Sequence, residues 1–373
     1  MLGVLEVVGR GSGFLRRREA SYLPSQGDVH VGERLIRQFG LRTGDEIAGS
    51  VRPGGKGRGP SLETISAIQG KSPEAVRERP EFSSLAAVHP NEQLRLESDG
   101  ASSGQPDYTN RVIDLLCPLG KGQRALIVAP AKAGKTMVLQ SIAQGVSLNY
   151  PTADLFILLV DERPEEVFEM EAAGVGEVIS SSFDNPAQRH VAVAELTLER
   201  ARRRVELGED VVLIVDSLTR LARAYNTVEK GTGRTLSGGL DAQSLEKPKR
   251  FLGSARRIDP SQSEGSLTII ATALVDTGSK MDQVIFEEFK GTGNSELVLS
   301  RELAERRIFP AIDLVASATR REELLLSEEA LAATRVLRQR ISGMTPINAM
   351  NDLLVELKRH PTNEQLIRAL NGR

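Results

Sequence analysis

From residue 111 onward, apolar runs of strand length alternate with longer segments of helical character. The clearest strands are expected at residues 124–129, 155–160, 177–181, 211–215 and 267–273, and the intervening helices at 134–146, 164–173 and 186–207. Strands that alternate with helices are typical of a mostly parallel sheet with helices packed on it. This part of the chain is therefore predicted to be an α/β domain.

The first 77 residues show a different pattern, in which short β-branched runs are separated by glycine-containing turns. Runs at residues 4–8, 28–31, 46–51 and 64–68 predict a small antiparallel barrel, with the tract 53–60 as a loop within it. Residues 78–110 are polar and rich in Pro, Ser, Asn and Gly, which indicates a connector. The last forty or so residues are expected to be helical, with Pro346 and Pro361 near helix starts. The expected organisation is a barrel domain at 1–77, a connector at 78–110 and an α/β domain with C-terminal helices at 111–373.

Composition narrows the class of protein. Of the 373 residues, 40% are hydrophobic and 26% are charged, as in ordinary globular proteins. No stretch reaches the ~20 apolar residues that a membrane-spanning helix needs, and the N-terminus lacks the apolar segment of a signal peptide. The single cysteine, Cys117, excludes an internal disulfide framework and is expected to be a small buried residue. These features predict a cytoplasmic protein with no membrane partner.

Charge restricts where nucleic acid could bind. The net charge is −2, so binding to RNA or DNA must depend on local patches. The first 58 residues hold ten Lys/Arg and six Asp/Glu. This surplus of four positive charges fits either a solvated basic face or a nucleic-acid site.

A phosphate-binding loop is predicted after the first strand of the α/β domain. Residues 129–136 read Ala-Pro-Ala-Lys-Ala-Gly-Lys-Thr, follow an apolar strand and open a helix. Backbone N–H groups of Lys132, Ala133 and Gly134 can surround phosphate oxygens at the helix N-terminus. Lys135 is expected to contact the β- and γ-phosphates of ATP, and the Thr136 hydroxyl to bind Mg²⁺. The loop departs from the general pattern because alanine stands at the position of its first glycine.

Two further strands end in carboxylates. The apolar run 211–215 ends at Asp216, which is the form of a Walker B element that holds Mg²⁺, although a helix-capping aspartate has the same appearance. The run 158–160 is followed by Asp161, Glu162 and Arg163. A glutamate at the carboxyl edge of a parallel sheet can orient and polarise an attacking water, whereas a structural ion pair with Arg163 is the alternative. Together with the loop, these elements predict an ATPase site.

Several motifs resemble those of the bacterial transcription termination factor Rho family, a family of ring-forming RNA helicases. The similarity extends from about Val4 to the C-terminus and is densest between residues 111 and 325. The segments that carry it are 120–124, 129–136, 161–167, 216–226, 248–251, 268–285, 287–294 and 299–313. The alanine at the loop's first glycine position is itself a feature of that family.

The resemblance implies a RecA-like P-loop ATPase domain preceded by an OB, cold-shock-like barrel, assembled as a homohexamer that hydrolyses ATP while pulling on RNA. It assigns the catalytic carboxylate to Glu162, the Walker B role to Asp216, and an arginine finger that reaches a neighbouring subunit to Arg320. Phe309 and Met137 would flank the adenine and Arg163 would lie near the phosphates. The resemblance also assigns nucleotide binding to the turn before the first strand, which consists of Gly120, Lys121, Gly122, Gln123, Arg124 and Ala125.

Two loops would contact RNA in the centre of such a ring. The second of them contains Lys280. The first resembles the segment 231–239 and contributes Gly233, Arg234, Thr235, Ser237, Gly238 and Gly239. Glycines in this segment permit close approach of the backbone to RNA, although a glycine-rich stretch is also typical of ordinary surface loops.

The barrel resembles a domain that captures single-stranded, pyrimidine-rich RNA by stacking bases on aromatic side chains. Phe14, Arg16 and Tyr22 match that family's pattern. Ser12 replaces a phenylalanine and His30 replaces a tyrosine, so fewer bases can stack and binding is expected to depend more on arginine and on salt. The family's small helical domain ahead of the barrel does not precede residue 1.

Two alternatives have specific predictions. A ring ATPase of the rotary ATP synthase or flagellar-secretion type shares the barrel, the phosphate loop and the hexamer, but segments 276–280 and 287–294 resemble the termination factors instead. A non-catalytic RNA-binding protein would not require Lys135, Glu162 and Arg320 together. RNA polymerase and elongation factors are further partners that the resemblance suggests.

Overall fold

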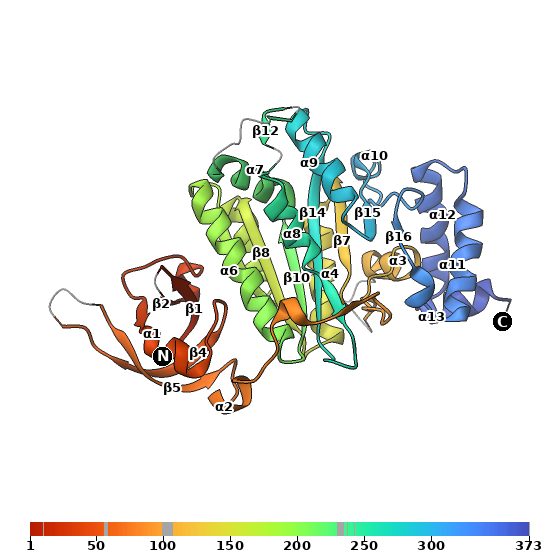
Figure 1. Cartoon of the computed structure of the whole chain (residues 1–373). Coiled ribbons are helices and arrows are strands. Elements are labelled where there is room, and N and C mark those ends of the chain that lie inside the picture. The colour runs from red at the N-terminus through yellow and green to blue at the C-terminus, as the bar shows by residue number, and fades with distance from the viewer. Residues whose placement is uncertain are drawn as a thin grey trace.

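A computed structural model describes residues 1–9, 11–55, 59–98, 107–229, 235–236, 238–241 and 243–372. The N-terminal part is a closed five-stranded barrel in the order β1-β2-β3-β5-β4, and Figure 1 shows it beside the larger α/β body. Its elements are β1 (Leu2–Val8), β2 (Ser12–Arg16), β3 (Val29–Val31), α1 (Glu33–Phe39), β4 (Glu46–Arg52), β5 (Ser61–Ile68) and α2 (Pro73–Val76). This topology confirms the predicted OB-like barrel, including one strand, β2, that the apolar pattern alone did not delimit.

The larger body is built on a nine-stranded sheet whose main path runs β16-β15-β7-β14-β10-β8-β9. The strands are β6 (Ala87–Val88), β7 (Arg124–Pro130), β8 (Asp154–Glu162), β9 (Glu177–Ser182), β10 (Asp210–Asp216), β13 (Arg256–Ile258), β14 (Ser266–Val275), β15 (Ser295–Val298) and β16 (Ala318–Thr319). The central pairs are parallel, whereas β13 and β16 pair antiparallel at the margins. The predicted mostly parallel α/β sheet is confirmed.

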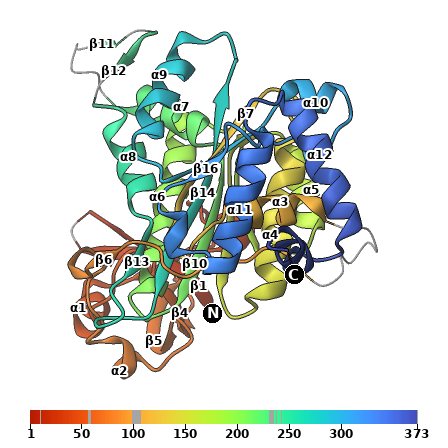
Figure 2. The ribbon, with the colours of Figure 1, turned by 90° about the vertical axis from the view of Figure 1, so that its right-hand side faces the viewer.

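Helices pack on both faces of this sheet (Figures 1 and 2). They are α3 (Tyr108–Leu116), α4 (Lys135–Asn149), α5 (Pro164–Ala172), α6 (Ala187–Val205), α7 (Leu218–Val228), α8 (Glu246–Gly253), α9 (Lys280–Lys290), α10 (Arg301–Glu305), α11 (Glu328–Ile341), α12 (Pro346–Arg359) and α13 (Asn363–Leu370). A separate small hairpin joins β11 (Thr235–Leu236) to β12 (Leu240–Asp241). None of the helices within the described ranges combines the length and the apolar character that crossing a bilayer requires.

Strand β10 shows why the apolar runs are continuous. Val212 and Ile214 belong to the core that includes α4, while Val211, Leu213 and Val215 belong to the core that includes α6 and α7. Side chains alternate between the two faces of a strand, so a strand covered on both faces needs apolar residues at every position.

The segment between the two folded parts is more ordered than its polar composition suggests. Phe82, Leu85, Leu94 and Leu96 are buried in the cores of the α/β body. Strand β6 pairs with β13, which extends the sheet. Residues 78–98 therefore pack along the α/β body, and the rest of the predicted connector up to 106 lies outside the described residues.

Buried charges fix the barrel against α6. Arg79 donates to both carboxylate oxygens of Asp45 at 2.7 Å and to Glu206 at 3.1 Å. Asp45 comes from the barrel and Glu206 from the end of α6, and the side chains of both have 0% exposure. Gly44 lies so close to the backbone of α6 that a Cβ there would approach Glu199 to 2.5 Å. The barrel and the α/β body are thus held in one defined orientation.

We expect Arg79→Met to lower the stability of this interface by about 3–5 kcal/mol, because it leaves Asp45 and Glu206 as buried charges that have lost a partner. Urea unfolding followed by circular dichroism measures the change, with Arg77→Met as the control because the Arg77 side chain is exposed. Equal midpoints for the two variants would show that the buried pairs contribute no net stability.

Candidate functional site

The predicted phosphate loop forms the connection from β7 to α4. Pro130 ends β7 and Lys135 is the first residue of α4, with Gly134 as its N-cap. Lys132 and Gly134 have φ angles of +65° and +83°, which glycine adopts freely and lysine rarely. These left-handed residues turn the loop so that the N-terminus of a fifteen-residue helix faces the space above β7. Ala133 is buried inside the loop, and Thr136 follows Lys135 as a half-buried residue.

Lys135 lies between the two predicted carboxylates. Its Nζ is 2.9 Å from Glu162 Oε1 and 2.7 Å from Asp216. Burial lowers the pKa of Lys135, but attraction to Asp216 and Glu162 outweighs burial, so the pKa is raised overall and the ammonium stays charged. Burial raises the pKa of Asp216. The fold therefore brings three residues from positions 135, 162 and 216 into one charged cluster.

A bulge at the end of β8 directs Glu162 into this cluster. Asp161 has a φ of +57°, and the pairing of β8 with β9 shifts register between Val160 and Glu162. Glu162 is 1% exposed, and its Oε2 accepts no hydrogen bond although Arg220 Nη1 lies 3.3 Å away. A buried carboxylate oxygen without a hydrogen-bond donor is available to a water or a ligand group.

Three neighbours of the cluster had no role in the sequence analysis. Thr272 on β14 donates to Asp216 at 2.7 Å. Glu166 on α5 brings a third carboxylate within 4.8 Å of those of Glu162 and Asp216. Arg220 belongs to the motif 216–226, but the motif alone does not show that its guanidinium faces Glu162.

Residues predicted to hold the base of the nucleotide lie at the loop. The ring of Phe309 approaches Gly134 so closely that a Cβ on the glycine would be 3.6 Å from Phe309 Cε1. Met137 is 56% exposed on the first turn of α4. Arg163 is exposed and lines a cavity of about 590 Å³ together with Phe183, Arg220 and Arg223.

The structure does not bring the turn 120–125 to the phosphate loop of the same chain, and that expectation is corrected. The turn precedes β7 and the loop follows it, so seven residues at ~3.3 Å each put about 20 Å between them. Lys121 pairs with Glu92 and Asp210, while Gly122 donates its N–H to Thr268 at 2.8 Å. Any contact of Gly120, Lys121, Gly122, Gln123, Arg124 or Ala125 with a nucleotide must involve a neighbouring copy.

Arg320 lies on the same far side. Its backbone N–H donates to Asn294 O, and Arg124 N donates to Asn294 Oδ1, both at 2.9 Å. The side chain of Arg320 is exposed and makes no ion pair within the described residues. This position excludes contact with the chain's own phosphate loop and leaves the guanidinium free to reach another copy.

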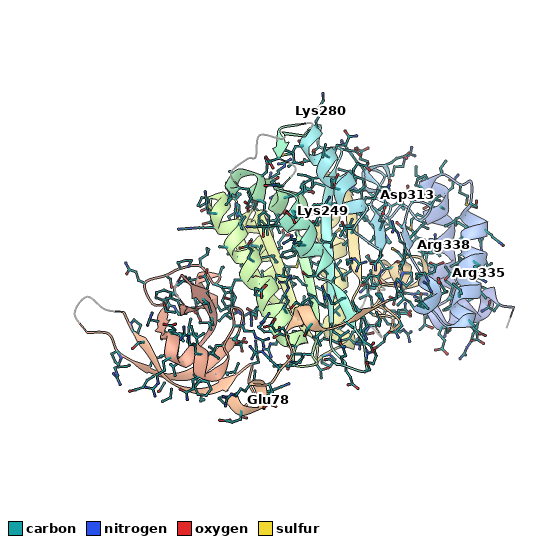
Figure 3. The ribbon with its side chains drawn as sticks, viewed as in Figure 1. Glu78, Lys249, Lys280, Asp313, Arg335 and Arg338 are labelled. Carbon is teal, nitrogen blue, oxygen red and sulfur yellow. The ribbon has the colours of Figure 1, made fainter. Side chains whose placement is uncertain are left out.

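The two predicted central RNA loops are neighbours. Gly238 lies so close to the start of α9 that a Cβ on it would be 2.6 Å from Met281 N and 3.0 Å from the carbonyl carbon of Lys280. Gly238 and Gly239 are exposed with φ angles of +81° and +80°. Lys280 is exposed at the end of the molecule opposite to Glu78 (Figure 3). Gly233, Arg234 and Ser237 lie outside the described residues, and of Thr235 only the strand backbone is described.

Helix α7 connects the charged cluster with these loops. Arg220 near its start faces Glu162, and Arg223 one turn later donates from Nε to Asp282 Oδ1 at 2.8 Å. Asp282 belongs to the first turn of α9, two residues after Lys280. A movement of α7 therefore affects both the carboxylate of Glu162 and the position of Lys280.

The barrel presents a small aromatic site and corrects one expectation. Phe14 and His30 form an edge-to-face pair with centroids 5.6 Å apart, and the Arg16 guanidinium lies 5.2 Å from the Phe14 ring. Arg16 is itself buried against Glu6 and Asp28. Tyr22 is only 8% exposed, because its hydroxyl bonds to Glu177 and Arg200 of the α/β body. Tyr22 therefore has no free face for a base and belongs to the interface between the two folded parts.

The fold and the site define a RecA-like, nucleotide-binding ATPase with an attached OB-type RNA-binding barrel. Residues 109–319 match the nucleotide-binding domain of the ATP synthase alpha/beta family, and residues 1–74 match the RNA-binding domain of the Rho termination factor. An ATPase of a bacterial type III secretion system has a similar fold, with a TM-score of 0.61 at 24% identity over 86% of this chain and 93% of that one. These matches agree with ATP hydrolysis and RNA binding in one chain.

Relatives of known name decide between the alternatives. Transcription termination factor Rho of Haemophilus influenzae is 52% identical over 99% of this chain and 87% of its own length. The factor of the same name from Escherichia coli K12 is 52% identical over 97% of this chain and 85% of its own. The chain belongs to the transcription termination factor Rho family, and its function is RNA-binding, ATP-dependent transcription termination. The secretion-type and non-catalytic alternatives are not favoured.

Proposed function

We propose that this protein is an RNA-dependent ATPase and RNA helicase, which acts as a ring of six copies on single-stranded, pyrimidine-rich RNA. The observation that carries the proposal is the cluster of Lys135, Glu162 and Asp216 beneath a phosphate loop, in a chain that also holds an RNA-binding barrel. Helix α7 supplies a physical link from that cluster to Lys280, so ATP turnover and RNA contact can be coupled.

In the proposed mechanism, Lys135 leaves the carboxylates and pairs with the β- and γ-phosphates when ATP binds. Glu162 then accepts a proton from the attacking water through the oxygen that has no hydrogen-bond donor. Arg320 of a neighbouring copy stabilises charge on the transferred phosphoryl group. Backbone N–H groups of Lys132, Ala133 and Gly134 orient the phosphate oxygens.

A magnesium ion fits the donors at this site. The oxygens of Glu162, Glu166 and Asp216 lie within 4.8 Å of one another, and hard oxygen ligands are those that Mg²⁺ prefers. We assign Thr136 and Asp216 to hold the ion. When bound, Mg²⁺ neutralises negative charge on the β- and γ-phosphates.

RNA would contact the protein at two places. Phe14 and His30, backed by Arg16, offer a stacking surface in the barrel, while Gly238, Gly239 and Lys280 offer a flexible cationic surface at the other end of the molecule. Because the barrel carries one aromatic pair, stacking contributes only ~1–3 kcal/mol per base and the remaining affinity must be electrostatic.

Steady-state ATPase activity tests the proposed function. Turnover is expected to rise strongly with poly(C), and to remain at the basal level without nucleic acid or with duplex DNA. Equal rates in all three conditions would contradict an RNA-dependent motor. A response to poly(U) or poly(A) but not to poly(C) would contradict the base preference and leave the motor function intact.

We expect Phe309→Ala to raise the KM for ATP about threefold to tenfold with little change in kcat, because loss of an aromatic contact costs ~0.5–1.5 kcal/mol of binding. The control is Leu148→Ala, which removes a 49% exposed side chain near the other end of α4. An unchanged KM for Phe309→Ala would show that the ring belongs to the core and does not contact adenine.

A further inference from the structure

Helix α5 presents an acidic face to solvent. Glu165, Phe168 and Glu169 are spaced i, i+3 and i+4, so they share one side of the helix, whereas Met170 is buried on the other side. Phe168 is 70% exposed. Neither glutamate forms an ion pair within the part of the chain that the structure describes. We call Glu165, Phe168 and Glu169 the acidic face; it adjoins the ATP site, because Glu165 lines the same cavity as Arg163 and Arg220.

A basic edge lies on the opposite side of the molecule and consists of Arg124, Lys290 and Arg320. Arg124 Nε donates to Thr292 O at 3.0 Å, two residues beyond Lys290. No carboxylate pairs with any of the three among the described residues. Burial, reinforced by the charge of Arg320, lowers the pKa of Arg124, so this guanidinium is held close to a like charge.

The acidic face and the basic edge cannot meet within one chain. Helix α5 connects β8 to β9 at one end of the sheet path, while Arg320 follows β16 at the other end. Neighbouring strands are ~4.8 Å apart, so six steps along the path separate the two ends by roughly 29 Å. Complementary charges at opposite ends of a subunit can pair only between copies, in a head-to-tail contact.

We propose that the acidic face of one copy docks on the basic edge of the next copy, with Phe168 as the apolar anchor of the contact. This inference rests on the proposed ring and specifies which surfaces form its junctions. Docking would bring Arg320 toward the neighbour's ATP site, since the acidic face adjoins that site. The excess acidity of α5 thus complements the excess of arginine and lysine beside the finger.

A charge exchange tests the contact. One variant carries Glu165→Lys with Glu169→Lys, and the other carries Arg124→Glu with Lys290→Glu. Alone, each variant opposes like charges at every junction, so we expect assembly at concentrations at least about tenfold higher than for the parent. In an equimolar mixture, rings that alternate the two variants have opposite charges at every junction. Analytical ultracentrifugation and native mass spectrometry should therefore show rings of mixed composition.

Controls separate docking from folding. Glu171→Lys adds the same charge change to a different side of α5 and should assemble like the parent, whereas Phe168→Ala should weaken assembly. Circular dichroism melting checks each fold. If the paired substitution at Arg124 and Lys290 fails to fold, Lys290→Glu alone takes its place, because that side chain is exposed.

Normal assembly of the Glu165→Lys, Glu169→Lys chain would overturn the proposed contact, as would two folded variants that fail to form mixed rings. These outcomes are distinct from failure of the proposed function. If the parent protein itself forms no ring, or its ATPase activity ignores RNA, the proposed function fails before the charge exchange is measured.

Discussion

Glu162→Gln is expected to reduce ATP turnover by about two to four orders of magnitude, which is the usual contribution of a general base. The change removes the proton acceptor and preserves the size of the side chain. Lys135 keeps its partner Asp216 at 2.7 Å, so the phosphate loop should retain its ability to bind ATP. Single-turnover hydrolysis, together with binding of a fluorescent ATP analogue, separates the two effects.

Glu171→Gln is the matched control for Glu162→Gln, because Glu171 is an exposed glutamate on α5 with no contact to the charged cluster. Its turnover should equal that of the parent. If Glu162→Gln hydrolyses ATP at the parental rate, the water must be activated elsewhere, and Glu166 would be the next carboxylate to replace.

Arg320→Ala is expected to reduce turnover by a factor of roughly 10³–10⁵, as removal of an arginine finger does. The reason is its location beside Asn294 and Arg124, on the side of the molecule that cannot reach its own Lys135. Binding of RNA by the barrel should persist, because Phe14 and His30 are remote from the change. Steady-state ATPase activity and RNA filter binding measure the two properties.

Mixing two inactive chains tests whether the finger acts on a neighbour. Lys135→Ala destroys a chain's own phosphate loop but keeps its Arg320, whereas Arg320→Ala does the reverse. In mixed rings, some intact loops therefore sit next to intact fingers, and activity should reappear. Mixtures as inactive as their components would indicate that Arg320 acts within its own chain or only supports the fold.

Local patterns were sufficient to predict much of the fold. The run that became β10 is apolar on both faces because α4 covers one and α6 and α7 cover the other, and such a run is visible in the sequence alone. The phosphate loop is equally local, since strand, loop and helix follow one another directly. Strand β2 was harder to delimit, because its five residues include a glycine and a serine.

The charged cluster was predicted only as separate parts. Lys135, Glu162 and Asp216 each end or begin a regular element, and a parallel sheet brings such ends together. Arg220 and Thr272 were not recognised, because their roles depend on how α7 and β14 lie against β8 and β10. The assignments of Lys135, Glu162, Asp216 and Arg320 to catalysis stay predictions until the variants are measured.

Two expectations failed for the same physical reason. Tyr22 matched a pattern associated with RNA, yet its hydroxyl contacts Glu177 and Arg200, which are 155 and 178 residues away. Turn 120–125 is close to the phosphate loop in sequence, but the length of β7 separates the two in space. Neither a contact over such a separation nor the direction of a strand can be read from the residues concerned.

The contact of Tyr22 with Glu177 makes the barrel a handle on the catalytic strands. Glu177 is the first residue of β9, and Ser182 at the other end of β9 pairs with Glu162. An extended strand resists stretching, so a pull on the barrel is transmitted along ~20 Å of backbone to the carboxylate that activates water. Tension in RNA held by the barrel would thereby act as a mechanical load on the hydrolysis step, in addition to the signal that travels from Lys280 through α7.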